Sequence, residues 1–176
     1  MIWRETELPG AFVVESKPIE DERGWFVRIY DESEFEERGL ASRFVQSSAA
    51  FNKEWGTLRG LHYQVDPHAE AKLVRCTHGA VFDVIVDLRP DSSTFKRWAA
   101  VELSAESGRM LYVPEGLAHG YLTLEDETET FYLISAAYAP KAARGVRWDD
   151  AAFGIEWPHD PRVMSERDKA WPDFSG

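Results

Sequence analysis

The chain has 176 residues, 44% hydrophobic and 29% charged, which is the composition of a globular protein with one substantial core. Its net charge of −11 argues against a nucleic-acid-binding protein, although a local basic pocket could still bind an anionic small molecule. No apolar run reaches the ~20 residues that cross a bilayer, no signal peptide opens the chain, and a single Cys76 favours the reducing cytoplasm.

Short segments rich in β-branched and aromatic residues predict strands at 25–30, 72–76, 81–88, 98–103, 110–113 and 130–135. In 81–88, Phe82, Val84 and Val86 alternate with Asp83 and other residues, which predicts one apolar face. Helical signals are few: 31–38 could form a short helix, and Ser165 resembles the start of a capping box.

The absence of repeats and linkers predicts one domain over residues 1–176. Many short strands with few helices predict an all-β fold, an antiparallel jelly roll or sandwich with short peripheral helices. Strand count alone leaves an immunoglobulin-like sandwich open.

Two short motifs carry the first chemical signal. Gly108 and the segment 114–119, Pro-Glu-Gly-Leu-Ala-His, resemble the second motif of the cupin superfamily, which aims a histidine, here His119, into a β-barrel. The matching first motif carries His62 and, two residues later on the same strand face, Gln64, where metal-binding cupins have a second histidine. Because glutamine is a poor ligand for transition metals, we expect no metal site.

A histidine that binds no metal can act as a base near neutral pH, because its unperturbed pKa is ~6.5. A lone histidine is more often a satisfied core residue, so residue type alone leaves this alternative open for His62. Arg59 lies three residues earlier, and its charge is costly to bury without an anionic partner. The segment 58–64 therefore suggests a site with a base and an anionic ligand.

Further motifs follow in the order and approximate spacing of a known family. They are Arg23-Gly24-x-Phe26, 58–64, 72–75, 83–89, 114–120, Tyr132, Tyr138, 148–150, 155–158 and Ser165-x-x-Asp168. The series resembles the dTDP-4-dehydrorhamnose 3,5-epimerase family over nearly the whole chain. The resemblance implies a homodimeric, cofactor-independent isomerase of deoxysugar biosynthesis. Such an epimerase inverts C3, C5 or both carbons of a nucleotide-diphosphate-linked 4-keto-6-deoxyhexose.

The resemblance also implies roles for single residues. His62 would remove the proton that the C4 ketone acidifies, Asp168 would orient its imidazole, and Tyr132 would return a proton from the opposite face. Lys72 would stabilise the C4 oxyanion. Further substrate contacts would come from Arg23 and Arg59 at the diphosphate, His119 near the sugar, Tyr138 at the nucleobase, and Arg28, Ser47, Ser48 and Arg167.

Several of these residues also have a structural explanation. Asp168 could be only the third residue of the helix cap that Ser165 begins. Tyr132 could be ordinary packing, and it shares a strand face with Tyr138 only if no bulge or turn intervenes. Lys72 could be a strand-edge lysine that protects against aggregation.

The chain departs from the family where the nucleobase is read. Arg28 stands where the family commonly has Glu, Ala143 stands where another Glu is expected, and Ser47-Ser48 falls in the region of a Gln-Asp-Asn motif. Hydrogen-bond acceptors are thus lost or replaced by a donor, which leaves thymine and other bases open.

Two other classes of function remain alternatives. A metal-dependent cupin oxygenase or sugar isomerase is disfavoured by Gln64. A non-catalytic sugar-nucleotide-binding cupin is disfavoured because binding alone requires neither a base nor an acid.

Overall fold

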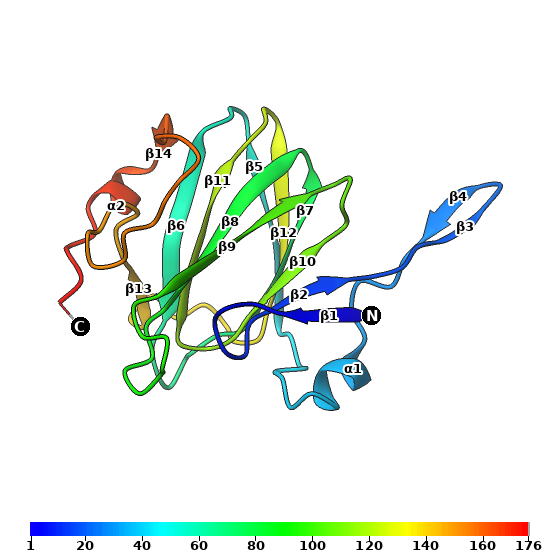
Figure 1. Ribbon diagram of the computed structural model, residues 1–176, viewed down its shortest axis with the longest axis horizontal. Helices are drawn as coiled ribbons and strands as arrows, with labels where there is room; N and C mark the ends of the chain where they lie inside the picture. The colour runs from blue at the N-terminus through cyan, green and yellow to red at the C-terminus, as the bar shows by residue number, and fades with distance from the viewer. Residues whose placement is uncertain (176) are drawn as a thin grey trace.

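The computed structural model describes residues 1–175, which form two six-stranded sheets packed face to face (Figure 1). The first sheet has the order β1 (Ile2–Glu5), β2 (Phe12–Glu15), β10 (Met110–Val113), β7 (Lys72–His78), β12 (Thr128–Ile134) and β5 (Gln46–Asn52). The second has the order β13 (Ala143–Gly145), β6 (Thr57–Gln64), β11 (Leu117–Thr123), β8 (Ala80–Asp87) and β9 (Trp98–Ser104), with β14 (Val163–Met164) also paired to β6. All pairs in these two sheets are antiparallel except β14 with β6. The prediction of an antiparallel, jelly-roll-type sandwich is confirmed.

Both predicted helices are present, the first of them shorter than 31–38. Helix α1 (Glu32–Glu36) follows Asp31, whose carboxylate accepts from the Ser33 N–H. Helix α2 (Glu166–Lys169) follows Ser165, whose hydroxyl oxygen accepts from the Asp168 N–H at 3.1 Å, as the capping signal predicts. Within residues 1–175, neither helix has the length and apolar character to span a bilayer.

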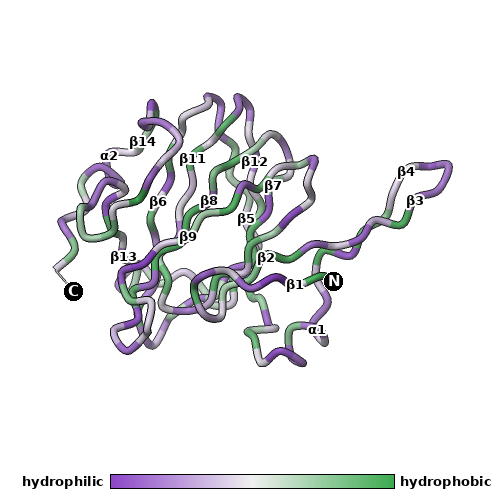
Figure 2. The backbone as a smooth tube through the Cα atoms, viewed as in Figure 1, coloured by the Kyte–Doolittle hydropathy of each residue, from purple (hydrophilic) through white to green (hydrophobic). Residues whose placement is uncertain are grey.

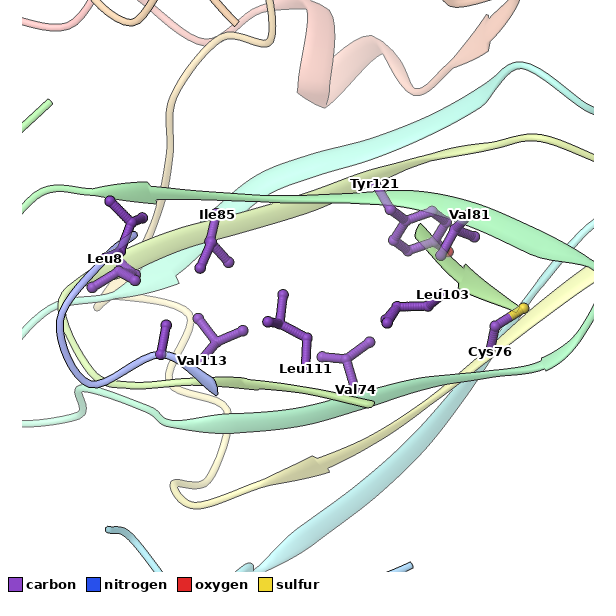
Figure 3. Packing of buried hydrophobic residues seen from close by; sticks show 11 residues of the cluster. Leu8, Val74, Cys76, Val81, Ile85, Leu103, Leu111, Val113 and Tyr121 are labelled. Carbon is purple, nitrogen blue, oxygen red and sulfur yellow. The ribbon is translucent and has the colours of Figure 1, made fainter. Parts of the chain in front are cut away.

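The main core lies between the two sheets, where Val74, Leu111 and Ile85 meet in Figure 3. A second cluster packs on the outer face of β8, where Val84 and Val86 are covered by the C-terminal part of the chain. The prediction that 81–88 has a single apolar face is therefore wrong, because both faces are buried.

The error has a physical cause in the two aspartates of β8. Asp83 and Asp87 are fully buried, and each is compensated by a partner: His119 for Asp83 and Arg89 for Asp87. A buried carboxylate is tolerated only with such partners, which the local pattern does not show.

A hairpin of β3 (Ile19–Asp21) and β4 (Gly24–Phe26) projects from the sandwich (Figure 1). Its tip is hydrophilic in Figure 2, yet Ile19, Trp25 and Phe26 are 70%, 65% and 64% exposed. The predicted strand 25–30 ends early, at Phe26, because Ile29 and Tyr30 pack against the core cluster around Phe35 instead of pairing in a sheet.

Candidate active site

A cavity of ≈ 720 Å³ opens between the two sheets. This volume lies in the range of about 300–1,000 Å³ that is typical of small-molecule sites. Ser48, Lys72 and Tyr132 reach it from one sheet. The facing wall consists of residues from the other sheet and from the segment around α2: Arg59, His62, His119, Ala143, Arg167 and Asp168.

The predicted base and its partner form a close pair. The Nε2 atom of His62 lies 2.6 Å from Oδ1 of Asp168, whose other oxygen lies 3.4 Å from the Gly60 N–H. Burial alone would raise the pKa of Asp168, but its hydrogen bonds, above all with His62, hold it below the usual value. An ionised carboxylate only accepts hydrogen bonds, so Nε2 carries a proton, and in the neutral imidazole that a base requires the lone pair is on Nδ1.

The cap explanation of Asp168 accounts for only its backbone. Ser165 caps α2 by accepting from the Asp168 N–H, and the Asp168 carboxylate is turned toward His62. Helix α2 thus positions the Asp168 carboxylate against His62, a residue 106 positions earlier in the sequence.

Tyr132 reaches the cavity from β12, which belongs to the sheet opposite that of His62. Its ring centre lies 6.2 Å from that of His119, and its hydroxyl is 3.0 Å from Thr130 Oγ1. Burial holds the pKa of Tyr132 well above its ordinary value, so this hydroxyl keeps its proton at neutral pH.

Lys72 lies on β7, which is flanked by β10 and β12, so it is not an edge-strand lysine. Its Nζ atom is 3.0 Å from Oε1 of Glu70 and 3.2 Å from the backbone oxygen of His62. The ammonium group has three donors, so these contacts leave one for a ligand in the cavity. Sequence reasoning missed Glu70, which also lines the cavity.

His119 forms a second buried pair, with Nε2 2.7 Å from Oδ1 of Asp83. It is paired with His62 across β11 and β6, so the two imidazoles occupy neighbouring strands. Sequence reasoning missed Asp83 as a partner, although a carboxylate in an otherwise apolar strand was the available signal.

Several predicted substrate contacts also line the cavity. Arg59 is held by its Nε–H, which donates to Oδ1 of Asn52 at 2.8 Å. Tyr138 follows the end of β12 and is 56% exposed, and its backbone N–H donates to the Gln46 side chain at 2.8 Å. Arg167 stacks its guanidinium over the Trp171 ring at 5.3 Å.

Three predicted contacts lie outside this cavity in the protomer. Arg23 is on the projecting hairpin and pairs with Asp21, and Arg28 is exposed with its Nε 3.7 Å from Asp31. Ser47 alternates away from the cavity, because its neighbours on β5, Gln46 and Ser48, both point into it. Gln46, which was not among the predicted contacts, lines the cavity instead of Ser47.

Gln64 is buried and committed to the backbone. Its Nε2 donates to the carbonyl oxygens of His68 and Ala137, and its Oε1 accepts from the Ala139 N–H at 2.6 Å. Among residues 1–175, no three His, Cys, Asp or Glu side chains gather as a metal-binding group.

Comparison with known proteins places this arrangement in a family. The family model described as dTDP-4-dehydrorhamnose 3,5-epimerase matches residues 5–176. The dTDP-4-dehydrorhamnose 3,5-epimerase of Shigella flexneri is 44% identical over 165 residues, covering 93% of this chain and 91% of that protein.

Two crystal structures are similar over nearly the full length. The epimerase of Elizabethkingia anophelis superposes with a TM-score of 0.95 at 39% identity, covering 99% of this chain and 96% of that one. The epimerase of Bacillus anthracis, solved with TDP and PPi bound, gives a TM-score of 0.94 at 39% identity, covering 98% and 99%. The resemblance seen in the sequence is confirmed: the chain belongs to the dTDP-4-dehydrorhamnose 3,5-epimerase family and is an isomerase of the epimerase class.

Proposed function

We propose that this enzyme inverts C3, C5 or both carbons of a dTDP-linked 4-keto-6-deoxyhexose, with His62 as the base and Tyr132 as the acid. The observation that carries this proposal is the placement of the two groups on facing sheets of one cavity. A planar intermediate bound between them would lose a proton to one side and gain one from the other, as inversion requires.

The proton transfers follow from the contacts of each group. Nδ1 of His62 takes the proton from the carbon beside the C4 ketone, and the bonding electrons move to the ketone oxygen as an enolate. Asp168 stabilises the imidazolium through Nε2–H. The hydroxyl of Tyr132 then protonates the carbon on the opposite face.

Cations around the cavity suit the charges of the substrate. The Lys72 ammonium group is held by Glu70 and the His62 carbonyl, and its remaining N–H stabilises the enolate oxygen. Arg59 and Arg167 bind the diphosphate, and Tyr138 stacks on the nucleobase at the open end. His119 and Ser48 contact the sugar nucleotide between these ends.

Two observations support a thymidine nucleotide despite the altered base contacts. Arg28 is turned toward Asp31 and does not place its charge in the protomer's cavity. Relatives at 39–44% identity over most of the chain carry names specific to dTDP sugars.

We also propose a homodimer in which the β3–β4 hairpin of one protomer completes the cavity of its partner. The hairpin exposes Trp25 and Phe26, which a second copy would cover. It carries Arg23, which has no contact with the cavity of its own protomer. A hairpin that reaches a partner would bring this arginine to a diphosphate.

Deuterium incorporation tests the reaction. The enzyme is incubated with dTDP-4-keto-6-deoxyglucose in D₂O, with the GDP- and CDP-linked sugars in parallel, and followed by NMR. We expect deuterium at C3, C5 or both of the dTDP sugar, together with inverted product. Exchange no faster than in buffer alone would overturn the proposed activity.

Calorimetric titration with dTDP, GDP, CDP and UDP tests the nucleotide. Binding of dTDP at least tenfold tighter than the others, a gap of ~1.4 kcal/mol, supports a thymidine nucleotide. Tighter binding of another nucleotide contradicts it, and Arg28→Glu would then show whether Arg28 sets the preference.

Mixing two defective variants tests the dimer. A heterodimer of His62→Ala and Arg23→Ala protomers has one intact site if Arg23 acts in the partner's cavity. Random mixing should then restore about a quarter of the wild-type sites. No gain over the separate variants would show that Arg23 does not act across a dimer.

A further inference from the structure

A row of buried polar side chains runs from Tyr132 across the interior of the sandwich to Arg59. The Tyr132 hydroxyl is 3.0 Å from Thr130 Oγ1, which is 3.2 Å from the Tyr121 hydroxyl. The Tyr121 hydroxyl is 3.2 Å from Nδ2 of Asn52, whose Oδ1 is 2.8 Å from Nε of Arg59. Thr130, Tyr121 and Asn52 are each at most 2% exposed, so water does not compete for these bonds.

Asn52, the member of the row that contacts Arg59, has a fixed orientation. The Nε of Arg59 can only donate, so the Asn52 atom that faces it is the carbonyl oxygen. The Thr128 carbonyl, 3.0 Å from Nδ2 of Asn52, can only accept, which sets the same orientation from the other side. The second N–H of Asn52 therefore donates to the oxygen of Tyr121.

The hydroxyl of Thr130 is the donor to Tyr132. The Tyr121 hydroxyl accepts from Nδ2 of Asn52 and donates to Oδ1 of the same side chain at 3.4 Å, an oxygen that also accepts from Arg59. Thr130 Oγ1 is placed to donate to either neighbouring tyrosine oxygen, and its single hydrogen goes to Tyr132, the nearer of the two at 3.0 Å against 3.2 Å. The oxygen of Tyr132 is thereby an acceptor toward Thr130, and its own hydrogen is left for the cavity.

We propose that Thr130 is a positioning residue that fixes the Tyr132 hydroxyl as a proton donor toward the substrate and stabilises its conjugate base. The proposal rests on the proposed role of Tyr132. When the O–H bond of Tyr132 breaks and the new C–H bond forms, the negative charge moves from the enolate to the phenolate. Thr130 is the group that donates to that phenolate, and solvent afterwards returns the proton.

The requirement for such a donor follows from burial. Burial and, after it, the neighbouring Tyr121 raise the pKa of Tyr132 and so oppose formation of the phenolate, whereas the hydrogen bond from Thr130 acts in the opposite direction. Tyr132 and Thr130 are two residues apart on β12, so both side chains lie on the same face of one rigid strand.

Thr130→Val removes the donor and keeps the shape of the side chain. A hydrogen bond to a charged group is typically strong enough that we expect inversion to slow by about 10- to 100-fold. Deuterium exchange that depends on His62 should change by less than about threefold, since the base is untouched. Thr130→Ser, which restores a hydroxyl, should recover inversion.

Thr128→Val is the matched control. Thr128 is another fully buried threonine of β12, and its hydroxyl donates to the Glu125 carbonyl at 2.8 Å, outside the row. It should lower thermal stability without separating inversion from exchange. Should Thr130→Val fail to fold, Thr130→Ala serves instead, because it also removes the hydroxyl that donates to Tyr132.

Inversion and exchange are measured together in D₂O for wild type, Tyr132→Phe and these variants. Loss of inversion with exchange retained in Thr130→Val or Thr130→Ala supports the inference. A folded Thr130→Val that inverts normally, or loses inversion and exchange equally, overturns it. If Tyr132→Phe itself inverts normally, the proposed acid is wrong; if it fails while Thr130→Val inverts normally, only the positioning role of Thr130 is refuted.

Discussion

Replacing Asp168 by Asn tests the base and its partner with the smallest change of shape. In the wild type the Gly60 N–H donates to Oδ2 of Asp168 at 3.4 Å. If the amide oxygen of the variant faces His62, its NH₂ group faces this Gly60 N–H, and two hydrogen-bond donors point at each other. If the amide is reversed, its NH₂ group faces Nε2 of His62, so the imidazole must carry its proton on Nδ1 and loses the lone pair that acts as the base.

The expected loss can be worked from the 2.6 Å bond between His62 and Asp168. A hydrogen bond to a charged group contributes about 1.5–3 kcal/mol, which corresponds to a loss of about 10- to 150-fold in the rate of proton abstraction. Deuterium exchange at C3 and C5 in D₂O should fall by this amount.

The fold provides a control for this prediction. The cap of α2 uses the backbone N–H of residue 168, so Asp168→Asn should leave the helix in place. Glu166→Gln changes an exposed acid of the same helix and should keep the wild-type rate. If Asp168→Asn exchanges within about threefold of wild type at an unchanged Tm, the role of the carboxylate is refuted.

Three further predictions concern binding and stability. Tyr138→Ala should raise KM about tenfold at constant kcat, because stacking on a base is worth ~1–3 kcal/mol; a fall in kcat alone would contradict this. In Gly120→Ala the new Cβ would lie 2.7 Å from the Arg59 carbonyl oxygen, so we expect about 3 kcal/mol less stability in urea unfolding, and an unchanged midpoint would refute the packing. Despite burial, hydrogen bonds led by Arg89 hold the pKa of Asp87 far below its unfolded value of ~3.9, so its stabilisation is present above that pH and lost below it. Asp87→Asn should therefore lower the free energy of unfolding by about 3 kcal/mol at pH 7 and make it less dependent on pH in the acid range. If wild type and Asp87→Asn lose the same amount of stability between pH 7 and pH 3, the role of Asp87 is contradicted.

Strands bounded by turn signals could be predicted from the sequence, as at 110–113, where the apolar run coincides with β10. The faces of strands were harder to predict. Whether Asp83 points into the protein depends on His119, which the chain brings beside it from 36 positions away. The local sequence of the β3–β4 hairpin likewise does not predict that it projects from the sandwich.

The family motifs identified His62, Tyr132, Lys72 and Asp168, and the structure brings all four to one cavity. Their partners are less visible in the sequence. Glu70, which precedes β7, is one charged residue among many in the sequence, and only the fold shows its carboxylate beside Lys72. Arg23, the substrate contact predicted on the hairpin, does not line the cavity of its own protomer, and its local sequence does not show which surface it faces.

The most direct test of the facing base and acid compares His62→Ala with Tyr132→Phe on dTDP-4-keto-6-deoxyglucose in D₂O. His62→Ala should lose both deuterium exchange and inversion, by about 10²–10⁴-fold. Tyr132→Phe should keep exchange on the His62 side and form little inverted product. Near-wild-type exchange in folded His62→Ala, or normal inversion in Tyr132→Phe, would contradict the mechanism.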